Sequence, residues 1–243
     1  MECNAGRKEI TFSIITVCYN SEKTIKYVME SVLSQTYDNY ELIVIDGKST
    51  DDTIKIVERY KKKFGDKLTV VSERDKGIYD AMNKGLLIAS GDLVCFLNSD
   101  DWFEKDALEN VLKARDNNRY QVIYGMQRTI TNNMEENCVI YSHNFISKKM
   151  LCHQALFSTK AIFDDYGVFD LKYKSAADYD WLINISKKQN VVFTPIYNIV
   201  VNFRSGGMSE SKAAMREMAK IQYKNGFIKM SRVLYLYAKS FFV

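Results

Sequence analysis

Short runs rich in valine and isoleucine alternate with longer amphipathic segments along the first half of the chain. A short run that is apolar at every position is typical of a strand buried on both faces of a sheet. Such runs predict four strands, at residues 12–19, 40–46, 68–72 and 92–98.

Segments with helical spacing of their apolar residues follow these strands, at residues 21–35, 52–64, 78–90 and 104–115. Asn20 and Ser21 are the N-cap candidates of the first helix. Strands that alternate with helices imply βαβ units and a parallel sheet covered by helices on both faces. The predicted fold class is therefore α/β, with a mostly parallel, Rossmann-like central sheet.

The pattern changes after Tyr120. Residues 121–128, 139–142 and 191–203 have the character of strands, and residues 153–163 and 179–188 that of helices. We expect this mixed region to complete a cleft within one domain of residues 1–210, followed by a helical tail of residues 211–243.

The net charge of +4 is distributed unevenly along the 243 residues. Residues 211–243 contain seven basic residues and a single acid, Glu217, and the rest of the chain carries a net charge of −2. Because the basic charge is confined to the tail, we expect no nucleic-acid partner. A composition that is 47% apolar excludes a disordered chain.

The five cysteines form no CxxC pair, which argues against a disulfide framework or a zinc site and favours a reducing compartment. The N-terminal residues lack the apolar region of a signal peptide. The longest apolar stretch, residues 191–203, is interrupted by Thr194, Pro195 and Asn198. We therefore expect a cytoplasmic protein without a membrane span.

Polar residues follow three of the four predicted strands. Ligands of an open parallel sheet bind at the carboxyl ends of the strands, which meet at one edge. Each aspartate here is also explained as a cap or turn residue, but the coincidence at three strand ends favours a binding site. The residues concerned are Asp46, Gly47, Arg74, Asp75, Gly77, Asn98, Asp100 and Asp101.

The run Asn98-Ser99-Asp100-Asp101 brings two adjacent carboxylates to the end of an apolar strand. A cation would relieve their repulsion, and oxygen ligands favour Mg²⁺ or Mn²⁺ held together with a phosphate. The alternative use of these aspartates is to cap the helix that begins near Glu104, and both uses are compatible. Neither a P-loop nor a GxGxxG motif is present.

These segments together resemble the family 2 inverting glycosyltransferases of the GT-A fold, especially bacterial enzymes that build capsular, exopolysaccharide or O-antigen repeat units. The resemblance covers about residues 12–209 and keeps the family's order of motifs. The motifs are TVCYN from Thr16, IDGKSTDDT from Ile45, ERDKGIYDAMNKG from Glu73, LNSDD from Leu97, HQALF from His153, SAADYDW from Ser175 and RSGGMS from Arg204.

The resemblance implies a nucleotide-sugar donor, with a UDP-sugar as the expected compound, and a glycan or lipid-linked saccharide as the acceptor. The activity it implies is the transfer of a hexosyl or N-acetylhexosaminyl group. Thr16, Tyr19 and Asn20 would lie beside the nucleotide, and Asp46 would hydrogen-bond the base.

Asp75 and the helix start from Gly77 to Asn83 match the family's nucleotide and donor-sugar pocket. Gly77 would allow the backbone to approach the ligand closely. Arg74 or Lys84 would meet phosphate.

Asn98 and Asp100 occupy the positions of the family's DxD motif, with Ser99 between them, so the resemblance implies cofactor contact here and Asp100 as the metal ligand. Asp178 matches the position of the catalytic base. An inverting transfer needs one such base, because the acceptor hydroxyl loses its proton while it attacks the sugar carbon.

The sequence departs from the family pattern at three positions. Asn98 replaces an aspartate, and this change would affect how tightly a metal ion is held. Ala177 replaces a glutamate that is common in the family, and Lys48 stands where the family usually has a small residue. Asp180 is the rival base, but two residues from Asp178 it should point elsewhere and serve as an acid of the first helical turn.

His153 either contacts donor or acceptor or is a structural histidine. Arg204 would reach a diphosphate if residues 204–209 close as a lid about their two glycines, and the alternative is an ordinary loop. Trp102 and Trp181 either stack on sugar rings or pack in the core.

The tail carries an apolar stripe at helical spacing with basic residues on the opposite side. Such a helix either covers the core or lies on an anionic membrane surface, which would make the protein peripheral on the inner face of the cell membrane. The stripe consists of Phe227, Met230, Leu234, Tyr237 and Phe241.

We expect a metal-dependent inverting glycosyltransferase. Two other classes of function stay open at this point. A non-enzymatic protein that binds sugar nucleotides or polyanions would show no turnover, and a nucleotidylyltransferase would release pyrophosphate.

Overall fold

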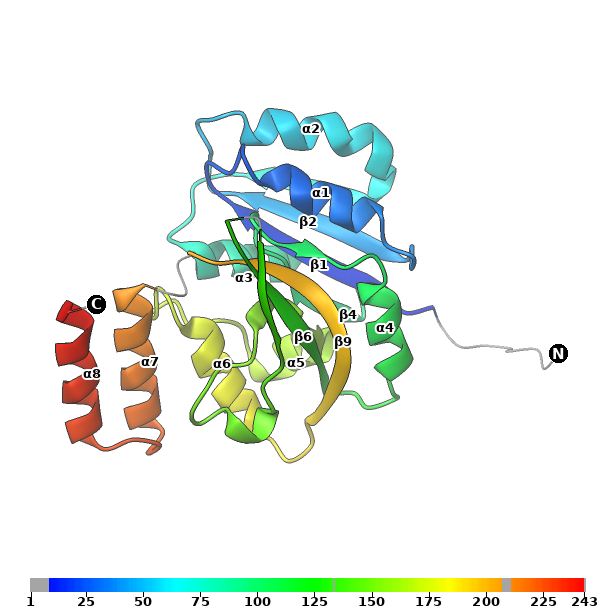
Figure 1. The fold of residues 1–243 in the computed structure, drawn as a ribbon. Helices are drawn as coiled ribbons and strands as arrows, with labels where there is room; N and C mark the ends of the chain where they lie inside the picture. The colour runs from blue at the N-terminus through cyan, green and yellow to red at the C-terminus, as the bar shows by residue number, and fades with distance from the viewer. Residues whose placement is uncertain (1–8, 133, 207–210, 243) are drawn as a thin grey trace.

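A nine-stranded sheet forms the centre of the molecule, in the computed structural model that describes residues 9–132, 134–206 and 211–242 (Figure 1). Its strands are ordered β3-β2-β1-β4-β8-β6-β9-β5, and β7 pairs with β6 beside this path. The strands are β1 (Phe12–Cys18), β2 (Tyr40–Asp46), β3 (Leu68–Ser72), β4 (Leu93–Phe96), β5 (Trp102–Phe103), β6 (Gln121–Thr131), β7 (Met134–Val139), β8 (Leu156–Thr159) and β9 (Val192–Arg204).

Helices cover both faces of the sheet, as the alternating pattern predicts. One face packs against α1 (Ile25–Leu33), α2 (Thr53–Phe64) and α4 (Ala107–Ala114). The other face packs against α3 (Ile78–Ile88), α5 (Lys160–Tyr166) and α6 (Ala177–Ser186). Strands β1 to β4 are parallel to one another, so their carboxyl ends meet at one edge.

Gly85 brings α3 close to the sheet. A Cβ atom at this position would lie 2.5 Å from Cγ2 of Ile15 on β1, which is closer than real contacts allow. The missing side chain therefore sets how near α3 lies to the strand ends.

The prediction of a helix at residues 153–163 is wrong over most of that range. Residues 153–155 form a short 3₁₀ turn and Leu156–Thr159 form β8, and the helix begins only at Lys160. Strand β8 pairs antiparallel with β4 and with β6, and all four of its residues are buried. A strand buried on both faces has no alternation of apolar and polar residues that would distinguish it from a buried helix.

The strand expected at residues 139–142 lies earlier, at Met134–Val139. Four of its six residues are exposed, because β7 pairs with β6 on one side only. The short strand β5 was not expected, and it pairs antiparallel with β9.

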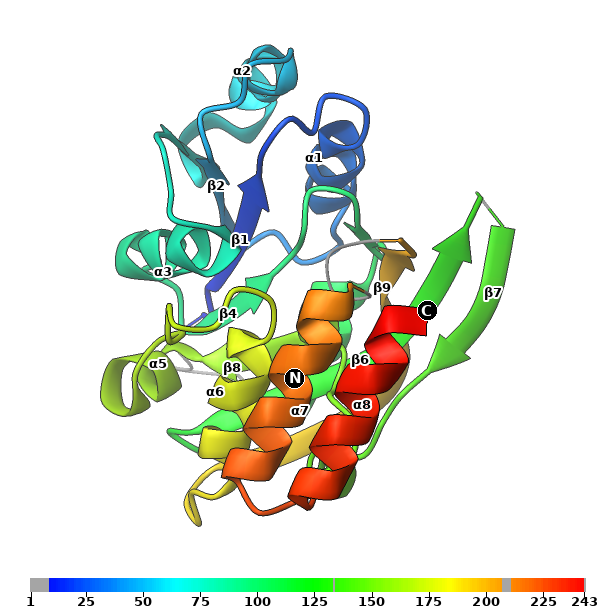
Figure 2. The same ribbon diagram turned by 90° about the vertical axis from the view of Figure 1, so that its left-hand side faces the viewer.

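The tail forms two helices rather than one stripe, α7 (Lys212–Lys224) and α8 (Met230–Phe242), joined at Gly226, where φ is +73°. Helix α7 contacts α6, and α8 contacts α7 (Figures 1 and 2). Leu234 of the expected stripe is 64% exposed, and Tyr237 faces α7. The Phe241 side chain lies outside the described residues. None of the helices in the described ranges is long and apolar enough to cross a membrane.

Candidate active site

A cavity of about 620 Å³ opens at the carboxyl edge of the sheet. Its walls come from both halves of the chain. The first half contributes Tyr19, Asp75, Gly77, Tyr79, Asn98, Ser99 and Asp100, and the second half contributes Cys152, His153, Ser175, Asp178 and Met218. The sequence therefore predicted eight of the residues that the structure brings together here: Tyr19, Asp75, Gly77, Asn98, Ser99, Asp100, His153 and Asp178.

Asp75 and Tyr19 line the cavity, and both side chains lie close to Gly47. A Cβ atom on Gly47 would lie 2.7 Å from Oδ2 of Asp75 and 3.4 Å from the Tyr19 ring. The other carboxylate oxygen of Asp75 accepts the backbone N–H of Gly77 at 3.0 Å. Gly77 has φ +127°, a conformation that favours glycine, and it leads directly into α3.

Asp46 is fully buried and lies outside the cavity wall. Its carboxylate accepts hydrogen bonds from the hydroxyls of Ser49 and Ser72, the latter at 2.6 Å, and from the backbone N–H of Ser49. The side chain therefore joins the ends of β2 and β3. Thr16 is also fully buried outside the wall, and its hydroxyl has no hydrogen-bond partner within the described ranges.

Three further residues expected at the donor pocket lie outside the cavity wall. Asn20 is exposed and accepts the backbone N–H of Thr50 at 2.9 Å. Arg74 is exposed at the surface. The amide of Asn83 bonds both the N–H and the carbonyl of Phe169, at 3.1 and 2.9 Å, so it holds the loop before α6.

Asp100 lines the cavity, and burial raises the pKa of its carboxyl. Asp101 is fully buried behind it, where burial and the neighbouring Asp100 raise the pKa of Asp101 well above its ordinary value. Oδ1 of Asp101 accepts the backbone N–H of Arg204 at 2.8 Å. The hydroxyl of Ser99 lies 2.8 Å from that of Ser21.

The oxygen donors at this point fit a divalent cation that has few protein ligands. Asp100 would supply one carboxylate, and the amide oxygen of Asn98 is buried without a partner in the part of the chain that is described. No cluster of three or more His, Cys, Asp or Glu side chains able to hold a metal occurs among the described residues. Mg²⁺ and Mn²⁺ sites of this kind take their other ligands from phosphate and water.

Arg204 ends β9 beside this cluster and outside the cavity wall. Its guanidinium lies against the rings of Tyr27 and Trp102, 5.2 and 5.3 Å from their centres. Its Nε–H donates to the backbone carbonyl of Asp100 at 3.4 Å. Trp102 thus packs against Tyr27 and Arg204. Residues 207–209 of the expected hinge lie outside the described residues.

Asp178 stands in the first turn of α6 with its side chain at the cavity wall. Oδ1 accepts the Tyr79 hydroxyl at 2.7 Å and the backbone N–H of Tyr179 at 2.9 Å. Oδ2 lies 3.7 Å from Nδ1 of His153. The carboxylate is thus oriented by donors from α3 and from its own helix. Asp180 points elsewhere, bonding Asn184 at 3.0 Å.

His153 packs face to face on Phe96, with ring centres 5.1 Å apart. Burial lowers the pKa of His153, and the charge of Asp178 opposes this effect. Its Nε2 is buried without a partner inside the described ranges. A neutral imidazole therefore forms the wall beside Asp178.

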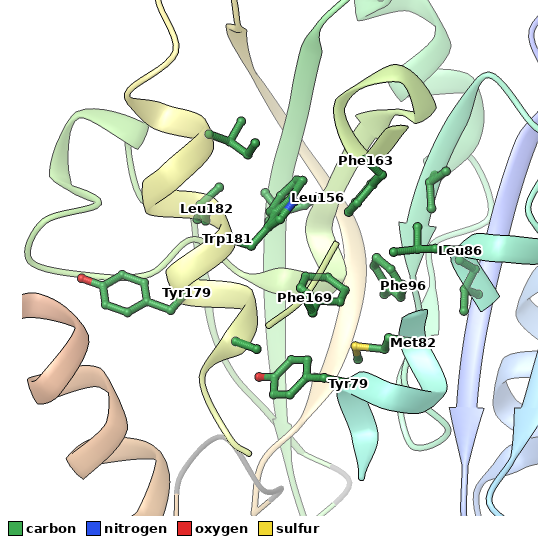
Figure 3. Close-up of a cluster of buried hydrophobic side chains, with 14 of the residues drawn as sticks. Tyr79, Met82, Leu86, Phe96, Leu156, Phe163, Phe169, Tyr179, Trp181 and Leu182 are labelled. Carbon is green, nitrogen blue, oxygen red and sulfur yellow. The ribbon is translucent and has the colours of Figure 1, made fainter. Parts of the chain in front are cut away.

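Tyr79 falls within the expected segment 77–83 without a role of its own, and Met218 is a wall residue that the sequence did not indicate. Tyr79 comes from α3, and Figure 3 shows its ring between α3 and α6 with the hydroxyl turned toward α6. Met218 comes from α7 in the tail. Their partners lie far away in the chain, so no local spacing could have indicated them.

The curled, mostly parallel sheet with a polar cavity at its carboxyl edge is a GT-A-like glycosyltransferase architecture. TarS of Staphylococcus aureus, solved in complex with UDP-GlcNAc, superposes with a TM-score of 0.70 at 21% identity, over 96% of this chain and 72% of that chain. The mannosyltransferase PcManGT of Pyrobaculum calidifontis, solved with GDP-Man and Mn²⁺, superposes with a TM-score of 0.69 at 20% identity, over 94% and 69%.

The chain belongs to glycosyltransferase family 2. The sequence pattern described as "Glycosyl transferase family 2" matches residues 13–168. The chain is also 29% identical over 211 residues to WfgD of Escherichia coli, a UDP-Glc:alpha-D-GlcNAc-diphosphoundecaprenol beta-1,3-glucosyltransferase, covering 86% of this chain and 82% of WfgD.

Proposed function

We propose that this glycosyltransferase inverts the configuration of the transferred sugar and uses Asp178 as its general base. The observation that carries the proposal is the position of Asp178, a carboxylate oriented at the wall of a cavity whose other walls hold Asp75 and Asp100. The three acidic side chains thus border one space that is large enough for a substrate.

The chemistry needs a single base. The acceptor hydroxyl attacks the sugar C1 and gives its proton to Asp178, while the bond between C1 and the diphosphate oxygen breaks and the nucleoside diphosphate leaves. Attack from the face opposite the leaving group inverts the configuration at C1. General-base catalysis of this kind contributes roughly 10²- to 10⁴-fold to the rate.

A divalent cation, Mn²⁺ or Mg²⁺, would be held by Asp100, with Asn98 beside it. When bound, it would stabilise the negative charge that develops on the departing diphosphate. The Mn²⁺ in the PcManGT structure and the unpartnered amide oxygen of Asn98 support this assignment.

The donor in this proposal is a UDP-sugar, and the transferred group is a hexosyl or an N-acetylhexosaminyl group. The support comes from the UDP-sugars named for WfgD and for the TarS complex. Asp75 and Tyr19 would line the donor end of the cavity, since both lie in its wall close to Gly47.

The acceptor in this proposal is a glycan or lipid-linked saccharide, because the named acceptor of WfgD is linked to diphosphoundecaprenol. We also propose that α8 lies on an anionic membrane surface at the inner face of the cell membrane. Leu234 and Tyr235 are more than half exposed on α8, and Arg232 lies on the same helix. This combination of apolar and basic residues suits a helix at a membrane interface.

A donor screen followed by one substitution tests the proposal. Nucleotide sugars are screened with and without Mn²⁺ for thermal stabilisation and for slow donor hydrolysis. With the donor that the screen selects, Asp178→Asn should lower kcat by at least about 10²-fold, because the base is lost, and leave UDP affinity unchanged.

Asp180→Asn is the matched control, since Asp180 lies on the same helix and bonds Asn184. It should keep kcat within a few-fold of the wild-type value. Full activity of Asp178→Asn would refute the assignment of the base. Absence of turnover by the wild type over the whole panel would favour a binding protein, and release of pyrophosphate would indicate a nucleotidylyltransferase.

A further inference from the structure

Glu217 is the single acidic residue of the basic segment 211–243. It lies on α7, which runs beside α6 (Figures 1 and 2). Its carboxylate accepts the backbone N–H of Lys174 at 2.9 and 3.1 Å and that of Ser175 at 2.7 Å. Both N–H groups belong to the turn that leads into α6.

This turn carries Asp178. Helix α6 begins at Ala177, and its N-cap residue, Ala176, has no side-chain oxygen to bond the first turn. Ser175 and Asp178 both line the cavity, one before the helix start and one just after it. Hydrogen bonds from outside the segment therefore fix the backbone from which Asp178 projects.

Helix α7 is itself anchored to the core around Glu217. Met218, the next residue, lines the cavity, and Ile221, one turn later, is fully buried in the core. Gln222 donates to the Tyr179 hydroxyl at 3.2 Å and to the Ser147 carbonyl at 3.3 Å. Glu217 thus reaches the turn from a helix that has its own contacts with α6.

We propose that Glu217 is a positioning residue for the base, holding the turn before α6 so that Asp178 faces the acceptor side of the cavity. This inference rests on the proposed function, in which Asp178 accepts the acceptor proton. Glu217 then acts on the base from the tail, although the two residues are far apart in sequence.

Replacing Glu217 by alanine tests the inference. Glu217→Ala should lower kcat roughly 10- to 100-fold, because a displacement of a catalytic group by about 1 Å costs up to about 10² in rate. The dissociation constant for UDP should stay within twofold of the wild-type value, since the donor end of the cavity is built by the first half of the chain. Glu217→Gln should recover part of the rate, because its amide keeps one acceptor oxygen.

Gln222→Ala is the matched control on the same helix. It removes contacts between α7 and the rest of the protein without touching the turn at residues 174–175. It should leave kcat within about twofold of the wild-type value. Hydrogen exchange of the amides at residues 174 and 175 should become faster in Glu217→Ala and stay unchanged in Gln222→Ala.

Three results would overturn the inference. The first is a kcat for Glu217→Ala within twofold of the wild type, and the second is an equal loss in Gln222→Ala. The third is unchanged exchange at residues 174 and 175 in Glu217→Ala. Failure of the proposed function has a different signature, because Asp178→Asn would then be fully active, whereas an inactive Asp178→Asn beside an active Glu217→Ala refutes only the positioning role.

Discussion

Tyr79 donates a hydrogen bond to Asp178, although the two residues are 99 positions apart in the chain. Burial raises the pKa of the Tyr79 hydroxyl, and the adjacent Asp178 raises it further, so the group stays protonated as a donor. A donor to a carboxylate stabilises its charged form and fixes its orientation.

Tyr79→Phe should therefore lower kcat by about tenfold, in line with the energy of a hydrogen bond to a charged group. Steady-state kinetics with saturating donor and acceptor measure the change in kcat.

Tyr179→Phe is the control, because Tyr179 is a second buried tyrosine whose hydroxyl donates to the Ile146 carbonyl at 2.7 Å. Figure 3 shows the Tyr179 ring on another side of α6 from Tyr79. An unchanged kcat in Tyr79→Phe, or an equal loss in Tyr179→Phe, would contradict the role given to Tyr79.

The sequence could predict those site residues whose position follows from the end of a strand or the start of a helix. Asp75, Asp100 and Asp178 are of this kind, and all three line the cavity. The use of each side chain could not be predicted, because it depends on partners elsewhere. Asp46 also lies at the end of a strand, but its carboxylate accepts hydrogen bonds from Ser49 and Ser72.

At the scale of elements, the parallel half of the sheet could be predicted because its strands alternate with amphipathic helices. In the second half of the sheet, β6 and β9 were predicted as strands, but β7 and β8 were not placed correctly. Strand β8 is buried on both faces and β7 is exposed over most of its length, so neither shows an alternating pattern. The tail was predicted as helical, but the break at Gly226 that folds α8 back on α7 was not.

Helix α8 offers a test of the membrane proposal. Leu234→Glu should weaken binding to anionic liposomes by about tenfold or more, because it removes the burial of one leucine and adds a negative charge. Donor hydrolysis in solution should not change, since Leu234 does not line the cavity. Co-sedimentation with vesicles that contain anionic lipid measures the binding.

Leu87→Glu serves as the control, because Leu87 is an equally apolar residue that is 86% exposed on α3. It should bind the vesicles as the wild type does. Unchanged vesicle binding of Leu234→Glu would refute the membrane role of α8.

At the scale of the whole molecule, the pH dependence of unfolding should carry a contribution from His153. The pKa of the buried imidazole is lowered from 6.5, so the unfolded chain binds a proton more readily than the folded protein does. The contribution of this imidazole to the free energy of unfolding is therefore fully present above pH 6.5. It is lost as the pH falls toward the lowered pKa.

The difference in unfolding free energy between the wild type and His153→Gln should thus be constant above neutral pH and shrink below it. The slope is at most about 1.4 kcal/mol per pH unit. Denaturant titrations at a series of pH values measure this difference. The contribution of His143 cancels in the difference because both proteins contain this residue. A difference that stays flat to pH 5.5, about one unit below the ordinary value, would contradict the effect.

Both halves of the chain build the cavity, and each half places a cysteine in its wall, Cys18 and Cys152. Cys152 lies in the wall, where burial raises the pKa of its thiol to about 12, whereas Cys138 lies on the edge strand β7. A protonated, covered thiol reacts slowly with alkylating reagents. A ligand that covers this part of the wall should slow the labelling of Cys152 further and leave that of Cys138 unchanged, a ratio that mass spectrometry measures without turnover.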